Sequence, residues 1–344
     1  MKKPIIVIKF GSASLADSRG EIDENVLASI ARQIASIHEQ YHVVIVSSGA
    51  VAAGKKHLKN YSGSLTERKA AASIGNPLLL KLYSTFFSKY GIQIGQSLCE
   101  RQHFSDRSRF LQLKKTYETL WENNIIPIAN ENDVVSNLEL RFSDNDELAT
   151  LIAVGFGASM LLFSTSVSGV LDGDGNVVRE IPEIDKRILG FANKEKSSLG
   201  LGGMISKLTF ARLATRMGIH AVIFGLKTED GIIKAVKGET GTNCHPQVST
   251  ANSRKKWLAS GSLVTGKLLI DNGASGAVLK GQSLLAVGVK SVINAFEAGE
   301  VFEIIDETEQ VIALGRSKIS SEEITKNIRT QKLVIAHADD IVII

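Results

Sequence analysis

Residues 23–40 have the sequence DENVLASIARQIASIHEQ, and they lie between two short apolar runs, IIVI at 5–8 and VVIV at 43–46. Apolar side chains recur along residues 23–40 every three or four positions, which is the spacing of one face of a helix, and the first turn is acidic. The order strand, helix, strand predicts a unit of a parallel α/β sheet. The apolar positions of the expected helix are Val26, Ile30, Ile34 and Ile37.

Three more apolar runs continue this pattern along the chain, at residues 125–128, 161–163 and 221–224. Strands that are apolar throughout are usually covered on both faces, because parallel sheets lie between helices. We therefore expect an α/β fold, a three-layer αβα sandwich around a mainly parallel sheet.

The sequence changes character at STANSRKKWLASGS, residues 249–262, which is polar and basic. Short alternating runs separated by Gly, Asn and Asp follow it, and such runs are typical of a small β domain. We predict a large domain at residues 1–250, a linker at 251–261 and a small, mostly β domain at 262–344.

The two predicted domains differ in charge. Residues 262–344 carry 8 Lys and Arg against 11 Asp and Glu, whereas residues 1–261 carry a net charge of +7. The net charge of −3 argues against RNA binding by the small domain, because Lys and Arg drive binding to nucleic-acid backbones. Within it, Ser320 followed by Glu323 is a capping-box pattern that predicts a helix over Ser321–Arg329.

The composition is that of an ordinary globular protein. Of 344 residues, 44% are hydrophobic and 22% charged, and the formal net charge of +4 gives little support for a dedicated nucleic-acid binder. Cys99 and Cys244 are too few for a disulfide framework, and neither has neighbours at zinc-ligand spacing, so we expect no structural zinc site and assign no metal-ligating residue. The first apolar run is broken at Lys9, which favours a first strand and a cytoplasmic protein over a signal peptide. No apolar run approaches the ~20 residues of a membrane span.

Two motifs follow the first two expected strands. Lys9-Phe10-Gly11-Ser12 offers a charge, a close backbone approach and a hydroxyl where the first strand ends, a combination that suits phosphate. A solvated lysine before a turn is the alternative. Residues 47–54, SSGAVAAG, offer a glycine turn and exposed helix-start N–H groups to an anion, although a tight packing corner explains them equally well.

Two polar clusters form the third motif, at Asn130-Glu131-Asn132-Asp133 and at residues 143–147, SDNDE. One follows an expected strand and the other precedes an expected helix, so both belong to one crevice. Their carboxylates and amides are suited to hold an ammonium group or to organise catalytic lysines. Caps and turns account for part of these residues.

The fourth motif is GLGGMISK, residues 200–207, which leads into a helical pattern. Glycines that let the backbone approach a polyphosphate, followed by a lysine in the first helical turn, suit a transferring phosphoryl group. A hinge loop with a solvent-facing lysine is the alternative.

Two further patterns are rejected. Residues 261–267 fit GxxxxGK, but Leu268 replaces the Mg²⁺-binding Ser or Thr, and residues 268–270 predict a strand where a P-loop needs a helix. Residues 172–176, DGDGN, resemble the start of a calcium loop but lack its later glycine and closing Glu, so we predict a hairpin turn.

With the four motifs in this order, the chain resembles the glutamate 5-kinases, a branch of the amino acid kinase family that phosphorylates the γ-carboxylate of L-glutamate with ATP as the first step of proline biosynthesis. The resemblance covers nearly the whole chain, and the C-terminal region resembles a PUA domain. The stretches that carry it are KFGS (9–12), SSGAVAAGKKHL (47–58), RFL (109–111), NNIIPIANENDVV (123–135), SDNDELA (143–149), GLGGMISKL (200–208) and RKKW (254–257).

The resemblance implies roles for particular residues. Lys9 and Lys207 match the lysines that neutralise the transferring phosphoryl group, and Asp146 matches the aspartate that holds them. The nucleophile is already an anion, so catalysis needs alignment and charge stabilisation rather than a general base. The residues implied to bind glutamate are Ser48, Gly49, Ala50, Asp133 and Asn145. Those implied to bind the nucleotide are Lys9, Gly11, Ser12, Thr165, Ser166, Gly202, Gly203, Met204 and Lys207.

The resemblance also implies cofactors and partners. These are ATP and Mg²⁺, feedback inhibition by proline at or beside the glutamate site, a homo-oligomer, and hand-over of the labile acyl phosphate to glutamate-5-semialdehyde dehydrogenase. The charge balance and the apolar runs described above, rather than the resemblance, predict no nucleic-acid and no membrane partner.

Three positions depart from the family pattern, all in the nucleotide half. Ser166 stands where an Asp is usual, Leu201 where a small hydroxyl residue is usual, and Ser206 where a Thr is usual. The first two each remove a hydrogen-bonding group, worth roughly 1.5 to 3 kcal/mol if nothing replaces it, and so bear on ATP affinity and nucleotide choice. They also motivate the alternative hypothesis of a non-catalytic glutamate or proline sensor on the same fold.

Overall fold

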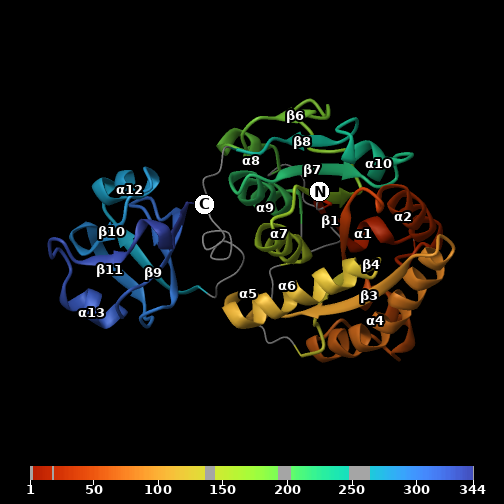
Figure 1. Cartoon of the computed structure of the whole chain (residues 1–344), viewed down its shortest axis with the longest axis horizontal. Coiled ribbons are helices and arrows are strands. Elements are labelled where there is room, and N and C mark those ends of the chain that lie inside the picture. Colours follow the sequence, from red (N-terminus) through yellow and green to blue (C-terminus); the bar gives the residue numbers. More distant parts are fainter. Residues whose placement is uncertain (1–2, 18, 136–143, 193–202, 248–263, 344) are drawn as a thin grey trace. The chain divides into compact units, whose positions relative to one another are not determined.

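Two compact units make up the chain (Figure 1). The first comprises Met1–His103 and Ser108–Ser249, and the second comprises Phe104–Arg107 and Thr250–Ile344. The structure is a computed structural model that describes residues 3–17, 19–135, 144–192, 203–247 and 264–343.

The first unit is built on an eight-stranded sheet in the order β3-β4-β2-β1-β5-β7-β8-β6. All neighbouring strands pair in parallel except β7 and β8, which are antiparallel. The predicted α/β class with a mainly parallel sheet is therefore confirmed. The strands are β1 (Ile5–Phe10), β2 (His42–Ser47), β3 (Gln93–Cys99), β4 (Ile125–Glu131), β5 (Met160–Thr165), β6 (Glu180–Ile181), β7 (His220–Gly225) and β8 (Thr242–Cys244).

All five predicted apolar runs form strands of this sheet, each extended by one or more residues. Strand β3 was not predicted, because QIGQSLC is not a continuous apolar run. It lies at the edge of the sheet, where half-exposed side chains are tolerated.

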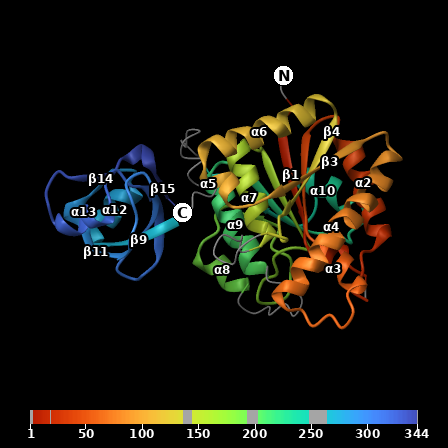
Figure 2. The same ribbon diagram turned by 90° about the horizontal axis from the view of Figure 1, so that it is seen from below.

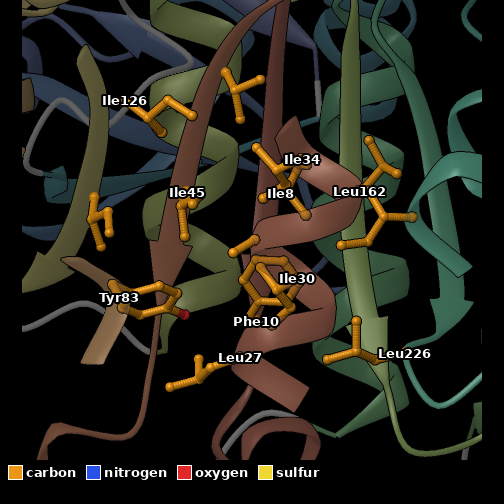
Figure 3. Close-up of a cluster of buried hydrophobic side chains, with 14 of the residues drawn as sticks. Ile8, Phe10, Leu27, Ile30, Ile34, Ile45, Tyr83, Ile126, Leu162 and Leu226 are labelled. Carbon is orange, nitrogen blue, oxygen red and sulfur yellow. The ribbon is translucent and has the colours of Figure 1, made fainter. Parts of the chain in front are cut away.

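Helices cover both faces of the sheet (Figure 2). Helix α2 (Glu24–Ile37) forms where residues 23–40 predicted it, and the Asp23 side chain accepts hydrogen bonds from the N–H groups of Asn25 and Val26. Helices α4 (Leu65–Ser88) and α10 (Gly231–Val236) share its face, and their side chains join those of β1 and β2 in one core (Figure 3). On the other face, α7 (Asn145–Phe156) packs on β1, and α9 (Met204–Arg216) packs on β7.

The remaining helices that precede residue 249 are short, apart from α6. They are α1 (Ser12–Leu15), α3 (Ala50–Gly54), α5 (Gln102–Ser105), α6 (Arg107–Glu122) and α8 (Lys186–Ala192). Helix α6 packs on α7 through the ring of Phe156, which lies 5.1 Å from that of Tyr117 and 6.5 Å from that of Trp121.

Helices α3 and α4 touch backbone to backbone. A Cβ placed on Gly75 would lie 1.7 Å from the carbonyl oxygen of Ala50, and one placed on Gly54 would lie 1.9 Å from that of Ala71. Only glycine permits this approach. The contact places the middle of α4 directly beside the start of α3.

The second unit is mostly β with its own core, as predicted. Its five-stranded sheet has the order β11-β9-β12-β13-β15, and β10 pairs with β14. Its elements are β9 (Val264–Ile270), α12 (Asn272–Leu279), β10 (Leu284–Leu285), β11 (Val289–Asn294), β12 (Val301–Ile305), β13 (Val311–Arg316), α13 (Ser321–Lys326), β14 (Val334–Ala336) and β15 (Ile341–Ile343).

Helix α13 is shorter than the predicted Ser321–Arg329. The Ser320 hydroxyl caps its start by accepting from the N–H of Glu323, as the sequence predicts. The side chain of Asn327 closes its end by donating to the carbonyl of Glu323 at 2.8 Å. Arg329 then adopts a φ of +69°, which a helix cannot include.

Both rejected patterns have the predicted structures. Gly266 and Lys267 lie inside strand β9 and open no helix. At residues 172–176 the Asp172 carboxylate accepts from two backbone N–H groups in a tight turn, flanked by an antiparallel bridge between Leu171 and Val177. Cys99 and Cys244 are buried free thiols. Of the helices in the described ranges, none has the length and apolar character needed to cross a membrane.

Candidate active site

The candidate residues gather at the carboxyl ends of β1, β2, β4 and β5. The chain leaves β1 toward β2 on one side, while β5 pairs with β1 on the other side, so the direction of winding reverses beside β1. Ligands of open α/β sheets bind at such a reversal. The N–H of Ser48 donates to the carbonyl of Phe10 at 3.0 Å and joins the ends of β1 and β2 there.

A buried ion-pair triad lies at this point. Lys9 alternates along β1 with Ile8 and Phe10, which pack into the core beneath α2, so its side chain lies on the opposite face, toward α7. Its Nζ is 2.5 Å from Oδ1 of Asp146, and Nζ of Lys207 is 3.0 Å from Oδ2 of the same carboxylate. The structure thus brings together the three residues predicted to be catalytic.

Burial makes this triad unusual. Asp146 is fully buried, and Lys9 and Lys207 are 4% and 6% exposed. The two ammonium groups and one carboxylate of the triad sum to one positive charge, which the nearby carboxylate of Asp144 offsets in part by its attraction to Lys207. Buried charges are costly unless they are paired, so an uncompensated positive charge here favours an incoming anion.

The triad shifts the pKa values of its members. Burial alone would raise the pKa of Asp146, but the charges of Lys9 and Lys207 outweigh it and hold that pKa below its usual value. Burial, with repulsion from Lys9, lowers the pKa of Lys207, although attraction to Asp146 opposes the change. The carboxylate is therefore ionised at neutral pH, while Lys207 is easier to deprotonate than a free lysine.

The first turn of α7 is fixed from two directions. Oδ1 of Asp144 caps the helix by accepting from the N–H groups of Asp146 and Glu147, at 2.8 and 3.1 Å. Oδ2 of Asp144 accepts from the hydroxyl of Ser206 at 2.5 Å. Because Ser206 precedes Lys207 in α9, this bond and the Lys207 ion pair join the starts of the two helices. Ser206 stands where a Thr is usual in the family, and its hydroxyl makes this hydrogen bond to Asp144.

A chain of amides lies beside the triad. The Nδ2 of Asn145 donates to Oγ of Ser48 at 2.9 Å and to Oδ1 of Asn130 at 3.0 Å. The Nδ2 of Asn130 donates in turn to Oδ1 of Asn76, at 3.1 Å. Oδ1 of Asn145 is buried and has no partner in the described parts of the chain. An unpaired buried acceptor indicates a place for a ligand donor.

The other residues predicted to bind glutamate surround this chain of amides. Gly49 caps α3 with a φ of +108°, which favours glycine, and Ala50 is the first residue of that helix. Asp133 is half-buried in the turn that follows β4. The two polar clusters of the third motif are joined directly by the bond between Asn130 and Asn145.

The residues predicted to bind the nucleotide divide into three groups. Gly11 lies beside the triad, since a Cβ placed on it would be 3.5 Å from Nζ of Lys9, and Ser12 begins α1. Gly203 and Met204 are the cap and first residue of α9. Thr165 ends β5 and the exposed Ser166 follows it. Gly202 and Leu201 lie outside the described residues, and no described hydrogen bond joins Thr165 or Ser166 to the triad.

Two residues that lie at the site were not predicted from the sequence. Asn76 comes from the middle of α4 and is 7% exposed. An Asn at an inward position of a helix was the signal that could have identified it. Arg101, after β3, forms an ion pair with Glu147 in the first turn of α7, and nothing local in the sequence indicates that pairing.

Within the described residues, no group of three or more His, Cys, Asp or Glu side chains is placed to hold a metal ion. The carboxylate of Asp146 is occupied by two lysines.

The chain is similar to known proteins over most of its length. The amino acid kinase family model matches residues 4–225, and the PUA domain model matches residues 266–336. The glutamate 5-kinase of Vibrio vulnificus (strain YJ016) is 35% identical over 332 residues, which cover 93% of this chain and 88% of that protein. The glutamate 5-kinase 2 of Pseudoalteromonas translucida (strain TAC 125) is 33% identical, covering 94% and 90%.

Solved structures share the fold. The carbamate kinase of Giardia lamblia bound to AMP-PNP superposes with a TM-score of 0.52 at 18% identity, over 71% of this chain and 98% of that chain. Another structure of Giardia carbamate kinase gives a TM-score of 0.51 at 18% identity, over 72% and 100%.

Proposed function

Because the chain belongs to the amino acid kinase family, we propose that it transfers the γ-phosphoryl group of ATP to the γ-carboxylate of L-glutamate. The products are ADP and L-glutamyl 5-phosphate, and the reaction is the first step of proline biosynthesis. The observation that carries the proposal is the buried carboxylate of Asp146, which holds Nζ of both Lys9 and Lys207 within 3.0 Å. Curated relatives named glutamate 5-kinase support the choice of substrate.

The triad suits phosphoryl transfer to an anion. A γ-carboxylate oxygen of glutamate attacks the γ-phosphorus, and the bond from that phosphorus to the β,γ-bridging oxygen breaks, so ADP leaves with the electron pair. The nucleophile carries no proton, and no general base is required. The negative charge on the transferred group is stabilised by Lys9 and Lys207, whose positions Asp146 fixes before the substrates bind. A sensor would need neither lysine.

Mg²⁺ belongs to this proposal as part of the nucleotide complex. In proteins this ion is usually held by substrate phosphates, waters and at most one or two carboxylates, and it neutralises charge on the phosphoryl oxygens. Because the triad is positively charged, it does not suit a cation, and the phosphates of the nucleotide would supply the oxygen ligands of Mg²⁺. We propose that Gly11, Ser12, Gly203 and Met204 contact the nucleotide around the triad, together with Thr165, Ser166 and Gly202.

The neighbouring polar groups suit the amino acid. Ser48, Gly49, Ala50, Asp133 and Asn145 are proposed to bind L-glutamate. The start of α3 offers N–H groups to a carboxylate, and the unpaired oxygen of Asn145 offers an acceptor to the ammonium group.

Regulation and assembly are finer parts of the proposal. They include inhibition by proline at or beside the glutamate site, a homo-oligomer, and hand-over of the acyl phosphate to glutamate-5-semialdehyde dehydrogenase. Hand-over would protect the product, since an acyl phosphate hydrolyses readily in water.

A hydroxamate assay tests the activity. Purified protein is incubated with L-glutamate, Mg²⁺ and each nucleoside triphosphate in turn, with and without proline, and hydroxylamine traps the acyl phosphate. Turnover with ATP that proline suppresses is the expected result. Folded protein that gives no hydroxamate with any nucleotide contradicts the proposal. If the protein prefers a nucleotide other than ATP, we would attribute that preference to Ser166 and Leu201, which depart from the family pattern.

A further inference from the structure

Two buried asparagines and one half-buried asparagine form a hydrogen-bonded relay from the core to the proposed substrate site. Asn76, Asn130 and Asn145 come from α4, β4 and α7, so they are far apart in the sequence. Asn145 donates to Asn130 at 3.0 Å, and Asn130 donates to Asn76 at 3.1 Å. Asn76 and Asn130 are 7% and 5% exposed, so water does not compete for these bonds.

Contacts with backbone groups identify the oxygen and the nitrogen of each amide in the relay. The oxygen and nitrogen of an amide side chain look alike, and only their partners decide which is which. The N–H of Glu131, which can only donate, lies 2.9 Å from Oδ1 of Asn130. The carbonyl of Ser47, which can only accept, lies 3.4 Å from Nδ2 of Asn145. Asn130 must therefore present its oxygen to Asn145, and Asn145 must present its NH₂ group to Asn130.

This direction leaves Asn145 with a free acceptor. Its Oδ1 is buried and unpaired in the described ranges. L-Glutamate at neutral pH has two carboxylates, which only accept, and one ammonium group, which only donates. The ammonium group is thus the part of this substrate that the oxygen of Asn145 can bind.

We infer that Asn76 and Asn130 are positioning residues that hold the amide oxygen of Asn145 toward the substrate, and that this relay makes the enzyme select an amino acid over the corresponding diacid without the amine. The inference rests on the proposed function. A rotated Asn145 would present NH₂ to the ammonium group, and the two donors would repel each other.

Asn76 makes a poor contribution to stability, which supports a positioning role. Its Nδ2 is buried without a partner in the described residues, and such a donor costs about 1 to 3 kcal/mol. Its neighbours in α4 include the buried apolar Ala72 and Leu79. An apolar residue would be cheaper at this position if Asn76 served only to fill the core.

The test compares two substrates and two substitutions. L-Glutamate and glutarate differ only in the ammonium group. Asn76→Leu removes the acceptor that orients Asn130, while Asn76→Asp keeps an oxygen there. In Asn76→Leu we expect the ratio of kcat/KM for L-glutamate to that for glutarate to fall about tenfold or more, through KM for L-glutamate. KM for ATP and the constants for glutarate should stay within about twofold, and Asn76→Asp should keep the wild-type ratio within about threefold.

A matched control separates positioning from stability. Leu79→Ala alters a buried residue of the same helix outside the relay, so it should lower the Tm without changing the substrate ratio. If Asn76→Leu does not fold, Asn76→Ala makes the same test. An unchanged ratio in the folded variant, or equal losses with both substrates, overturns the inference.

The same experiment distinguishes the inference from the proposed function. If the wild-type protein does not phosphorylate L-glutamate, the proposed function fails. Calorimetric binding of L-glutamate and glutarate to the wild type and to Asn76→Leu then decides the inference, since the relay predicts that only L-glutamate loses affinity.

Discussion

The ion-pair triad and the asparagine relay begin at adjacent residues, Asp146 and Asn145, yet they are built on opposite principles. The triad consists of full charges that surround one carboxylate, and its effect depends on distance. The relay is neutral, and its effect depends on which end of each amide faces its neighbour. Charge stabilises a phosphoryl group whatever carries it, whereas directed hydrogen bonds distinguish one substrate from another. Under the proposed function and the inference drawn from it, one helix turn supplies both rate and selectivity.

Substitutions in the triad should lower kcat with little effect on the preference for L-glutamate over glutarate. Substitutions in the relay should lower that preference with little effect on kcat. Variants of each region test whether the two are separable.

The largest effect is expected from Lys207→Ala. The substitution removes a buried ammonium group that neutralises the transferring phosphoryl group, and losing one such electrostatic contact typically lowers kcat about 10²- to 10³-fold. The hydroxamate assay measures kcat, and circular dichroism checks the fold. Lys237→Ala, at an exposed lysine after α10, is the control and should match the wild type. Retained turnover in Lys207→Ala would remove this lysine from the catalytic assignment.

Asp146→Asn should affect stability as well as rate. It leaves the ammonium groups of Lys9 and Lys207 buried beside a neutral amide, and breaking a buried ion pair from one side costs about 3 to 5 kcal/mol. Urea unfolding at pH 7 should show this loss. Because the pKa of Asp146 is lowered in the folded state, its stabilising contribution is present above pH 3.8 and is lost as the pH falls further. The wild type and Asp146→Asn should therefore converge in stability at acidic pH, and a constant difference would contradict the ionised carboxylate.

The pH dependence of kcat/KM, which reports ionisations of the free enzyme, is the third test. We propose that Lys207 acts in its charged form, and its pKa in the free protein lies below 10.5 because the side chain is buried. Rising pH should remove the charge earlier than in a free lysine, so kcat/KM should fall on the alkaline side with a midpoint below 10.5. Lys207→Arg keeps the charge at high pH, and its lower kcat/KM should lose this alkaline decline. The same decline in Lys207→Arg would assign it to another group.

The sequence was sufficient to predict most of the first unit, because its central strands are buried on both faces and are therefore continuously apolar. Strands β1, β2, β4, β5 and β7 were all predicted on this basis. Strand β3 was missed because it is an edge strand with half-exposed side chains. Its sequence, QIGQSLC, is neither a continuous apolar run nor a regular alternation of apolar and polar residues. The end of α13 was misplaced because a side-chain bond from Asn327, rather than a change in hydrophobicity, ends the helix.

The candidate site was only partly predictable for a related reason. Residues at the carboxyl ends of parallel strands must meet at one edge of the sheet, which is why Lys9, Ser48 and Asn130 were found. Asn76 reaches the site only because Gly54 and Gly75 let α3 and α4 touch, and no local pattern encodes that contact. Bonds such as the one from Ser206 to Asp144 join residues far apart in the chain and depend on the folded structure.

The smallest predicted effect concerns the bond that serves both regions. Ser206→Ala removes the hydroxyl that donates to Asp144, whose other oxygen caps α7 just before Asn145 and Asp146. Losing a half-buried hydrogen bond costs about 1 kcal/mol, so we expect a roughly fivefold effect. The loosened turn carries both the triad and the relay, so kcat should fall and KM for L-glutamate should rise together. A variant of the triad alone or of the relay alone should change only one of these constants. Ser206→Thr keeps a hydroxyl and should restore both constants. If Ser206→Ala changes only one of them, the first turn of α7 does not couple the two regions, and they act as independent parts of the site.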